Sequence, residues 1–335
     1  IAYYWARTAT CSNPSCGAEV PLLKGFYMVN KKGKQIYLDP KINGKEISFE
    51  VKKGTCHVNG WNNRCTLTCP CCGNLTTPAM LKEQFKAGKT GERLLAVICE
   101  DANGKSYRLP NQSEKDILSR VPKDSPRPSV MMEVKNTRNF NTPGWGINNY
   151  GQIFTDRQIT VLDKLVENFQ NLRKCFDDTD YSNAVLTYIA IWIDRIAVAN
   201  TSLGVWHTGG EKLERIMGRQ AIPMTFDYPE SQPFCNSSGS ALNQLDWILR
   251  YFESESSNEF PVSFAHSSSG EKAQFDNKSL TAVVTDPPYY DAIAYADISD
   301  FFYVWLKQTI GEVYPLVFAT PKTPKTEECT ALKHH

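Results

Sequence analysis

The sequence lacks a strong net charge, because 37 Lys and Arg residues almost balance 36 Asp and Glu residues and leave a formal charge of +1. Nucleic-acid binding must therefore come from a local patch rather than from the whole surface. The sequence also lacks an internal repeat and an opening secretory or transit segment. Its composition, 41% hydrophobic and 22% charged, is that of a soluble globular protein with room for two domains.

Long hydrophobic runs are missing as well. The most apolar window, AVLTYIAIWIDRIAVA over residues 184–199, is too short to cross a bilayer and contains Asp194 and Arg195. We therefore expect a cytoplasmic protein that does not bind membranes. The sequence begins at Ile1 without an initiator methionine and ends in TALKHH, so we expect an internal fragment of a longer protein.

Cysteine is the residue type with the most uneven distribution, since seven of the eleven cysteines lie in the first 72 residues. An odd number in a chain expected to be cytosolic argues against a disulfide framework. Two pairs, one in CSNPSCG and one in CPCCG, are each followed by a glycine that allows a tight turn. Two such turns can complete a tetrahedral sulfur site, so we predict structural zinc on Cys11, Cys16, Cys69 and Cys72.

Other ligand sets remain open at this point. Cys71 competes with Cys72 as the partner of Cys69, whereas we interpret Cys56, His57 and Cys65 as bystanders. The alternative for the whole group is a set of reduced, half-buried thiols. A site closed by four thiolates leaves no position for water, so this metal is not assigned to catalysis.

The segment between the two pairs predicts β-hairpins. Residues 25–40 (GFYMVNKKGKQIYLDP) and 45–58 (KEISFEVKKGTCHV) alternate in polarity and are broken by Gly and Asn. Residues 20–55 carry eight Lys and three Asp or Glu, a local excess of five positive charges. This basic ribbon is a candidate nucleic-acid contact. The alternative is an ordinary solvated face.

Composition and periodicity divide the chain into four parts: a β-rich zinc-ribbon module (1–110), an irregular connector (111–150), a mainly helical segment (151–255) and a C-terminal segment (256–335). We expect helices over 155–176, 182–202, 239–254 and 297–310, the first opened by a capping box at Thr155. Residues 204–230 are expected to be mostly irregular. In the helix over 239–254 we expect the apolar side chains to point inward, namely Leu242, Leu245, Ile248, Leu249 and Phe252.

The run SLTAVVT over 279–285 predicts a short buried strand that ends at Asp286-Pro287-Pro288-Tyr289 and precedes the last helix. Ligands of open α/β sheets lie at such strand ends. The exocyclic amine of adenine or cytosine is a poor nucleophile, and it needs two hydrogen-bond acceptors to hold it. The Asp286 carboxylate and the Pro287 carbonyl are such acceptors. The two prolines remove competing N–H donors, and Tyr289 offers a ring on which an extruded base can stack.

The residues that follow this motif complete the predicted pocket. Tyr290, Asp291 and Tyr295 are expected to line its rim together with Tyr289. The remaining step would be an in-line displacement from a sulfonium methyl donor, which depends mainly on positioning. The alternative for DPPY is a turn that caps a strand and leaves a tyrosine in the core.

These motifs carry a family resemblance. The DPPY sequence resembles that of the amino-group methyltransferases that act on DNA with S-adenosylmethionine. Four segments are similar to one branch of these enzymes, the zinc-ribbon-containing adenine-specific DNA methylases. They are DPPYYDAIAYADISDFFYVWLK, YYWARTATCSNPSCGAEVPL, CPCCG and GRQAIPMTFDYPESQPF. The resemblance implies a class I, Rossmann-like catalytic fold and a role for Asp286, Pro287, Pro288 and Tyr289 in catalysis. It also implies methylation of adenine N6 in DNA, a setting in restriction–modification or phage defence, and helicases or other defence proteins as partners.

One departure from that family is informative. Its glycine-rich loop, which holds the methionine part of the cofactor, has no counterpart here, and SGSALNQ (238–244) reads as a helix start capped by Ser238 or Ser240. We therefore expect an incomplete cofactor site and assign no cofactor-binding residue. The alternative functions are methylation of an RNA base or of cytosine N4, and a non-catalytic, zinc-dependent nucleic-acid-binding module.

Overall fold

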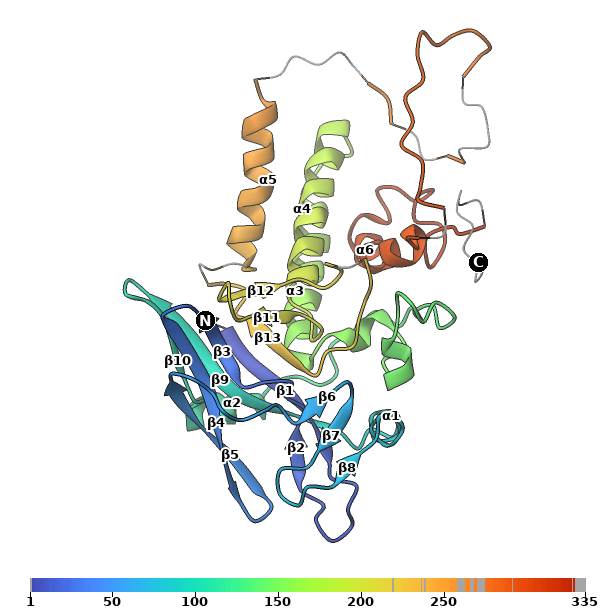
Figure 1. Ribbon diagram of the computed structural model, residues 1–335. Coiled ribbons are helices and arrows are strands. Elements are labelled where there is room, and N and C mark those ends of the chain that lie inside the picture. The colour runs from blue at the N-terminus through green and yellow to red at the C-terminus, as the bar shows by residue number, and fades with distance from the viewer. Residues whose placement is uncertain are drawn as a thin grey trace.

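The protein has a mixed α/β fold. The computed structural model describes residues 2–218, 220–235, 237, 239–257, 263–265, 268–269, 275–290, 292–326 and 328. Figure 1 shows a β-rich half that carries the N-terminus and a helical half beside it. The main sheet is antiparallel and contains five strands: β1 (Ala2–Thr10), β2 (Glu19–Pro21), β9 (Gly91–Asp101), β10 (Gly104–Arg108) and β13 (Asp227–Ser231).

Strand β1 lies at the centre of this sheet, whose order is β10-β9-β1-β13, and its second half also pairs with β2. The pairing of Trp5 with both Leu94 and Tyr228 joins segments that are far apart in the sequence. The expectation that residues 204–230 are mostly irregular is wrong at β13 and at a small hairpin of β11 (Val205–His207) and β12 (Lys212–Glu214). These strands are too short for a periodic pattern, and pairing with distant residues determines them.

Two smaller sheets complete the β-rich half. The first contains β3 (Tyr27–Lys31), β4 (Lys34–Asn43) and β5 (Glu46–Lys53), which confirms the predicted hairpins. The second contains β6 (Asn62–Asn63), β7 (Thr66–Thr68) and β8 (Leu75–Thr76). All of these strand pairs are antiparallel, so the described residues contain no parallel Rossmann-like sheet.

Six α-helices lie within the described residues: α1 (Pro78–Lys86), α2 (Gln112–Leu118), α3 (Asp156–Arg173), α4 (Asp180–Ala199), α5 (Ala241–Glu255) and α6 (Tyr295–Ile310). Two 3₁₀ turns occupy Thr142–Trp145 and Tyr150–Ile153. The capping box at the start of α3 is confirmed. The Thr155 hydroxyl accepts a hydrogen bond from the Gln158 backbone N–H, and the Gln158 side-chain oxygen accepts one from the Thr155 backbone N–H. Ser240 caps α5, as one of the two proposed serines.

The expectation that this apolar segment is too short to cross a bilayer is wrong, because α4 extends it to 20 residues and is long and apolar enough by length and composition; half of its apolar window, however, is buried inside the protein. It packs against α3, α5 and α6. It also carries Asp194, which is 4% exposed and whose Oδ1 has no hydrogen-bond partner among the residues that the structure describes. We therefore describe α4 as a core helix of a globular protein.

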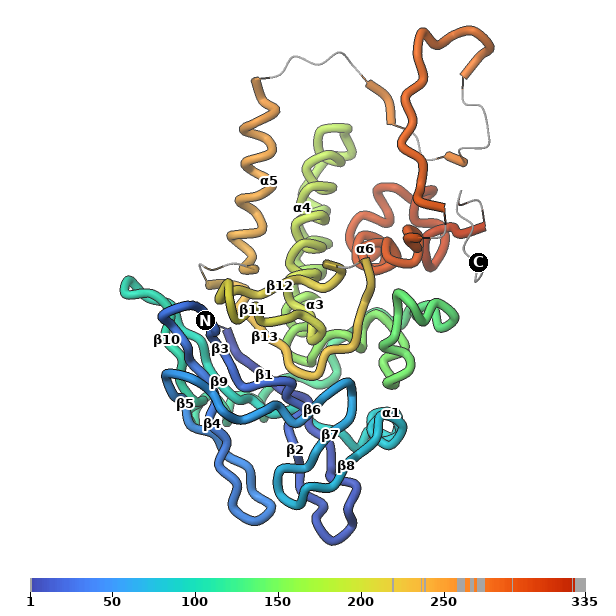
Figure 2. Tube along the Cα trace, viewed as in Figure 1, coloured from blue at the N-terminus to red at the C-terminus, as the bar shows by residue number. Residues whose placement is uncertain are grey.

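Helix α5 differs from its predicted orientation. Of the five apolar residues expected to face inward, Leu242, Leu249 and Phe252 are exposed, and Ile248 is the fully buried one. The physical reason is that α5 has α4 as its main helical neighbour, with Phe252 against Tyr188 at a ring distance of 4.5 Å. One neighbour cannot cover an apolar stripe that spans most of a helix face. Figure 2 follows α5 as a separate rod beside α4.

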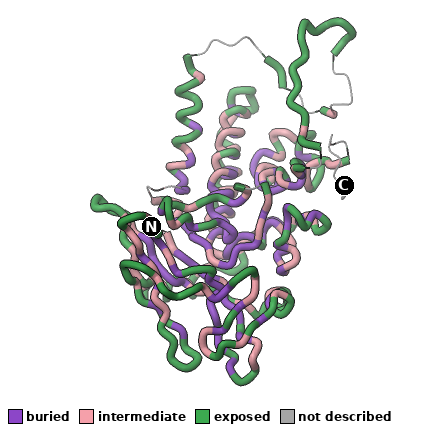
Figure 3. The backbone as a smooth tube through the Cα atoms, in the orientation of Figure 1, coloured by how far each residue is buried: buried purple, intermediate pink, exposed green. Residues whose placement is uncertain are grey.

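Helix α6 joins the main core through Phe154, which stacks on Phe301 and meets Trp305 edge-on. The segment just before it contradicts the predicted buried strand. Residues 279–285 form no strand and are exposed, with Val284 at 95%. A buried strand needs a paired neighbour on at least one edge, and no described residue pairs with this run. Figure 3 shows the exposed chain at this point.

Candidate metal centre and base-binding motif

Each cysteine pair lies in a turn between two adjacent strands. Cys11 follows β1 and Cys16 precedes β2, whereas Cys69 follows β7 and Cys72 precedes β8. The glycine after each pair has a positive φ, +59° at Gly17 and +75° at Gly73. A side chain is strained in this backbone region, so the glycines are required by the turns.

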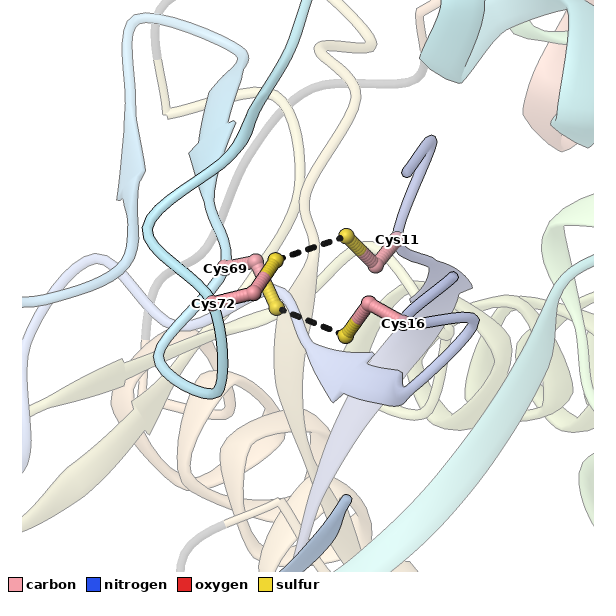
Figure 4. Close-up of side chains that lie close together, drawn as sticks. All are labelled: Cys11, Cys16, Cys69 and Cys72. Atoms are coloured by element: carbon pink, nitrogen blue, oxygen red, sulfur yellow. Dashed lines mark hydrogen bonds between the residues drawn. The ribbon is translucent and has the colours of Figure 1, made fainter. Parts of the chain in front are cut away.

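The four cysteine sulfur atoms lie close together. Cys11 Sγ lies 3.6 Å from Cys72 Sγ, and Cys16 Sγ lies 3.8 Å from Cys69 Sγ. All four lie within 4.8 Å of one another (Figure 4). Zinc–sulfur bonds of about 2.3 Å in a tetrahedron place neighbouring sulfurs about 3.8 Å apart. The geometry therefore fits a tetrahedral metal, and these are the four residues predicted from the sequence.

Hydrogen bonds fix the two turns to one another. The Cys11 amide donates to the Ala18 carbonyl at 2.9 Å, and the Cys69 amide donates to the Asn74 carbonyl at 2.9 Å. Between the turns, Ser12 Oγ accepts from Asn74 Nδ2 at 2.8 Å and from Thr76 Oγ1 at 3.0 Å. The sulfurs are thus brought together by protein contacts as well as by any metal they hold.

The sulfurs differ in how readily they ionise. A backbone hydrogen bond from Asn74 lowers the pKa of the exposed Cys72 thiol to about 7. Burial raises the pKa of the Cys11 thiol to about 12. Zinc binds thiolates, so metal binding here must release protons, most of all from the buried members of the set.

The other candidate ligands lie outside the cluster of four sulfurs. Cys71 is adjacent to Cys72 in the sequence but lies outside the cluster, and burial raises the pKa of its thiol to about 11. Cys56 points its sulfur at the Val58 carbonyl at 3.5 Å. His57 and Cys65 also lie outside the cluster. The interpretation of these residues as bystanders agrees with the structure.

The DPPY residues lie on the surface ahead of α6. Asp286, Pro287 and Tyr289 are exposed, Pro288 is half-buried, and 66% of Tyr289 is accessible. The chain turns back here, since the Tyr290 amide donates to the Pro288 carbonyl at 2.9 Å and the Ala292 amide donates to the Tyr289 carbonyl at 2.8 Å. The predicted motif therefore forms a turn whose carboxylate and phenol both face solvent.

The predicted rim residues are partly gathered around this turn. Tyr295, the first residue of α6, accepts a hydrogen bond at its hydroxyl from the Tyr289 amide at 3.4 Å. Tyr290 is exposed and adopts a positive φ of 29°. Asp291 lies outside the described residues.

The start of α6 is held by a buried polar cluster that the sequence analysis missed. Asp297 and Asp300 are fully buried on its first turns. Asp300 accepts from Thr323 Oγ1 at 2.6 Å and from Lys325 Nζ at 2.8 Å. Asp297 accepts from Asn136 Nδ2 at 3.0 Å. The cluster therefore fixes the N-terminal end of α6.

A signal for this cluster was present in the sequence. In YADISDFF the two aspartates are three residues apart, so they share one face of a helix whose other residues are largely apolar. Carboxylates in such a face are buried only when they are paired. Their partners, at Asn136 and Lys325, come from distant loops and could not be identified from spacing.

Comparison with known proteins adds no assignment: no family model, curated protein or solved structure matches this chain.

Proposed function

We propose that this chain carries the base-binding part of an S-adenosylmethionine-dependent methyltransferase that acts on the N6 amine of adenine in DNA. The observation that supports the proposal is the Asp-Pro-Pro-Tyr turn immediately before α6, which leaves a carboxylate and a tyrosine ring open to a ligand. A surface carboxylate alone is common. Its combination with two prolines and an aromatic ring suits a flat base with an amino group.

The Asp286 carboxylate and the Pro287 carbonyl accept the two N–H bonds of the amine and orient its lone pair outward. Neither proline has an N–H that competes for these acceptors. The Tyr289 ring stacks on the base after it is extruded from the duplex, and stacking on an aromatic ring is worth about 1–3 kcal/mol per base. The Tyr289 amide donates to the Tyr295 hydroxyl at 3.4 Å, which links the turn to the first residue of α6.

S-adenosylmethionine would supply the methyl group as an electrophile. The described residues contain no parallel sheet, and the Gly209-Gly210 turn after β11 joins an antiparallel hairpin instead of leading from a strand into a helix, so they do not fit a complete cofactor site. No residue of this chain is therefore assigned to the cofactor, and a Rossmann-like catalytic fold is part of the proposal. Zinc, by contrast, fits the four cysteines, where it stabilises the module and takes no part in catalysis.

The setting follows from the proposed reaction. A DNA-modifying enzyme of this type works in the cytoplasm, in restriction–modification or defence against phage, with helicases or other defence proteins as partners. An unmethylated duplex is its substrate. The same turn can also hold the amine of cytosine or of an RNA base, and without the cofactor the chain would act as a zinc-dependent nucleic-acid-binding module.

The test uses the complete protein that carries this chain. DNA and RNA are incubated with S-adenosylmethionine, and their methylated nucleosides are separated by mass spectrometry. The wild-type protein is expected to produce N6-methyladenine in DNA, and Asp286→Ala is expected to abolish it. Asp276→Ala is the matched control, because Asp276 is exposed and lies ten residues earlier.

The outcome separates the alternatives. Methylated cytosine in DNA would identify cytosine as the substrate instead of adenine. Methylated RNA together with unmodified DNA would identify RNA as the substrate. Full activity in Asp286→Ala would overturn the proposed role of the turn. Calorimetric titration with S-adenosylmethionine tests the cofactor site, since binding by this chain as tight as by the complete protein would contradict an incomplete site.

A further inference from the structure

A wide groove of about 840 Å³ lies between the β3–β4–β5 sheet and the edge strand β10. Its volume lies within the range of about 300–1,000 Å³ that is typical of ligand sites. The lining contains three lysines and no acidic residue: Gly33, Lys34, Gln35, Ile36, Val51, Lys53, Gly54, Lys105, Ser106 and Tyr107. Figure 1 places β10 at the margin of the main sheet, close to β4 and β5.

The strand register explains why cations gather here. Lys34 and Ile36 are two residues apart on β4 and share one face. Lys53 on β5 is paired with Ile36, so it points to that same face. Lys105 and Tyr107 occupy the facing wall on β10. The groove therefore has lysines along its walls and an apolar floor that includes Ile36.

A buried carboxylate fixes one end of the groove. Glu211 is 5% exposed, and it accepts from Lys31 Nζ and Lys34 Nζ at 2.7 Å each and from the Tyr107 hydroxyl at 2.6 Å. Lys105 Nζ donates to its backbone carbonyl at 2.7 Å. These bonds hold the β3–β4 turn against β10 and give the lysines defined positions.

The charges do not cancel. Glu211 neutralises only one of the two lysines it binds, and Lys105 lies 3.9 Å from the exposed carboxylate of Glu100. Lys53 is exposed and has no ion pair among the residues that the structure describes. Four lysines thus face two carboxylates, which leaves a local excess of two positive charges.

The groove rim also allows close approach of a ligand. Gly33 and Gly54 have positive φ values of +78° and +108°, and the position of a Cβ at either residue is open space. The backbone at the rim is therefore not shielded by side chains.

We propose that this groove binds the sugar–phosphate backbone of DNA. Lysine suits this role because its ammonium group neutralises phosphates as a point charge. The apolar floor and the Tyr107 ring accommodate the sugar. The proposal concerns binding alone, so it does not depend on methyl transfer.

The test is fluorescence anisotropy of the full chain with a labelled DNA duplex, without S-adenosylmethionine, between about 50 and 200 mM salt. Lys53→Gln is expected to weaken binding about three- to tenfold near 100 mM salt and to reduce the slope of log K against log salt by about 0.9. Lys45→Gln is the matched control, since Lys45 is exposed in the turn that joins β4 to β5, at the other end of the hairpin from Lys53. It is expected to bind like the wild type.

Equal affinity and equal salt slopes for Lys53→Gln and Lys45→Gln would overturn the proposal. Tighter binding of RNA of the same sequence, or stronger competition by polyglutamate than by unlabelled DNA, would assign the groove to a different partner. The binding assay contains no S-adenosylmethionine, so it does not report methyl transfer. A failure of the groove is thus distinguishable from a failure of the proposed reaction.

Discussion

The two regions that carry chemistry-bearing residues are built in opposite ways. Around the cysteines, three of the four ligands are buried and the turns are joined by hydrogen bonds through Ser12. Around the DPPY turn, the named residues are exposed or half-buried, and the buried carboxylates lie further along the chain on α6, at Asp297 and Asp300. The first region contains a complete set of four metal ligands, whereas the second, in the proposed function, supplies one wall of a base-binding site.

This difference shows what each function requires. A structural metal needs four ligands with fixed geometry, and two strand turns within one module supply all of them. A base-binding site needs a stacking surface, hydrogen-bond acceptors and a methyl donor held together, which requires more surface than one turn and one helix provide. The following predictions separate the two regions by how much each one contributes to stability.

The largest effect is expected at the metal. Cys72→Ser removes one thiolate, so the chain, which should bind about one zinc, loses it, and the β-rich half unfolds because metal binding and folding are coupled. Elemental analysis and circular dichroism measure both changes. Cys71→Ser is the matched control from the adjacent position and is expected to keep the zinc. Loss of zinc in the Cys71 variant would contradict the ligand set.

A smaller effect is expected at the start of α6. Asp300→Ala leaves Lys325, a mostly buried cation, without its closest carboxylate. Removing one member of a buried pair costs about 3–5 kcal/mol. Chemical denaturation measures this loss, which should leave the zinc content unchanged. Asp246→Ala, at an exposed position on α5, should cost less than about 0.5 kcal/mol. Equal losses in the two variants would show that the cluster is not an anchor.

The next effect depends on pH. Burial raises the pKa of Asp194 well above its usual value. Between the ordinary value of about 3.9 and the raised value, the folded state binds a proton that the unfolded state releases, so stability falls as pH rises. Asp194→Asn should remove this slope and be more stable than the wild type at neutral pH, by about 1–3 kcal/mol. Parallel pH profiles of thermal unfolding for the two proteins would refute it.

The smallest effect on stability is expected at the proposed catalytic turn. Asp286 is exposed, so Asp286→Asn should change the free energy of unfolding by less than about 0.5 kcal/mol. Its expected consequence is lost methylation alone. A melting temperature well below that of the wild type would mean that Asp286 supports the fold, and the comparison drawn above would fail.

Local pattern predicted the features that depend on neighbouring residues. The cluster of four cysteines follows from paired cysteines with a glycine after each pair, and the start of α3 follows from the Thr155 capping box. The β3–β4–β5 hairpins follow from alternation. Each is governed by contacts within a few residues, or by one kind of ligand that leaves few alternatives.

The errors share a physical reason. The run over 279–285 is apolar enough for a buried strand, but burial requires a partner strand and a covering layer, which the described residues do not provide. Helix α5 likewise has the pattern of a buried face and only α4 to cover it. Pattern indicates what a segment is suited to bury, and neighbours decide whether it is buried.

By itself, then, the sequence determined which four cysteines come together and where helix α6 lies. Only the tertiary structure decided that β13 joins β1, that Glu211 holds three strands together and that the DPPY turn is open to solvent. These features depend on contacts between distant residues, some of them more than two hundred positions apart in the sequence. Such contacts are set by packing, which no local pattern records.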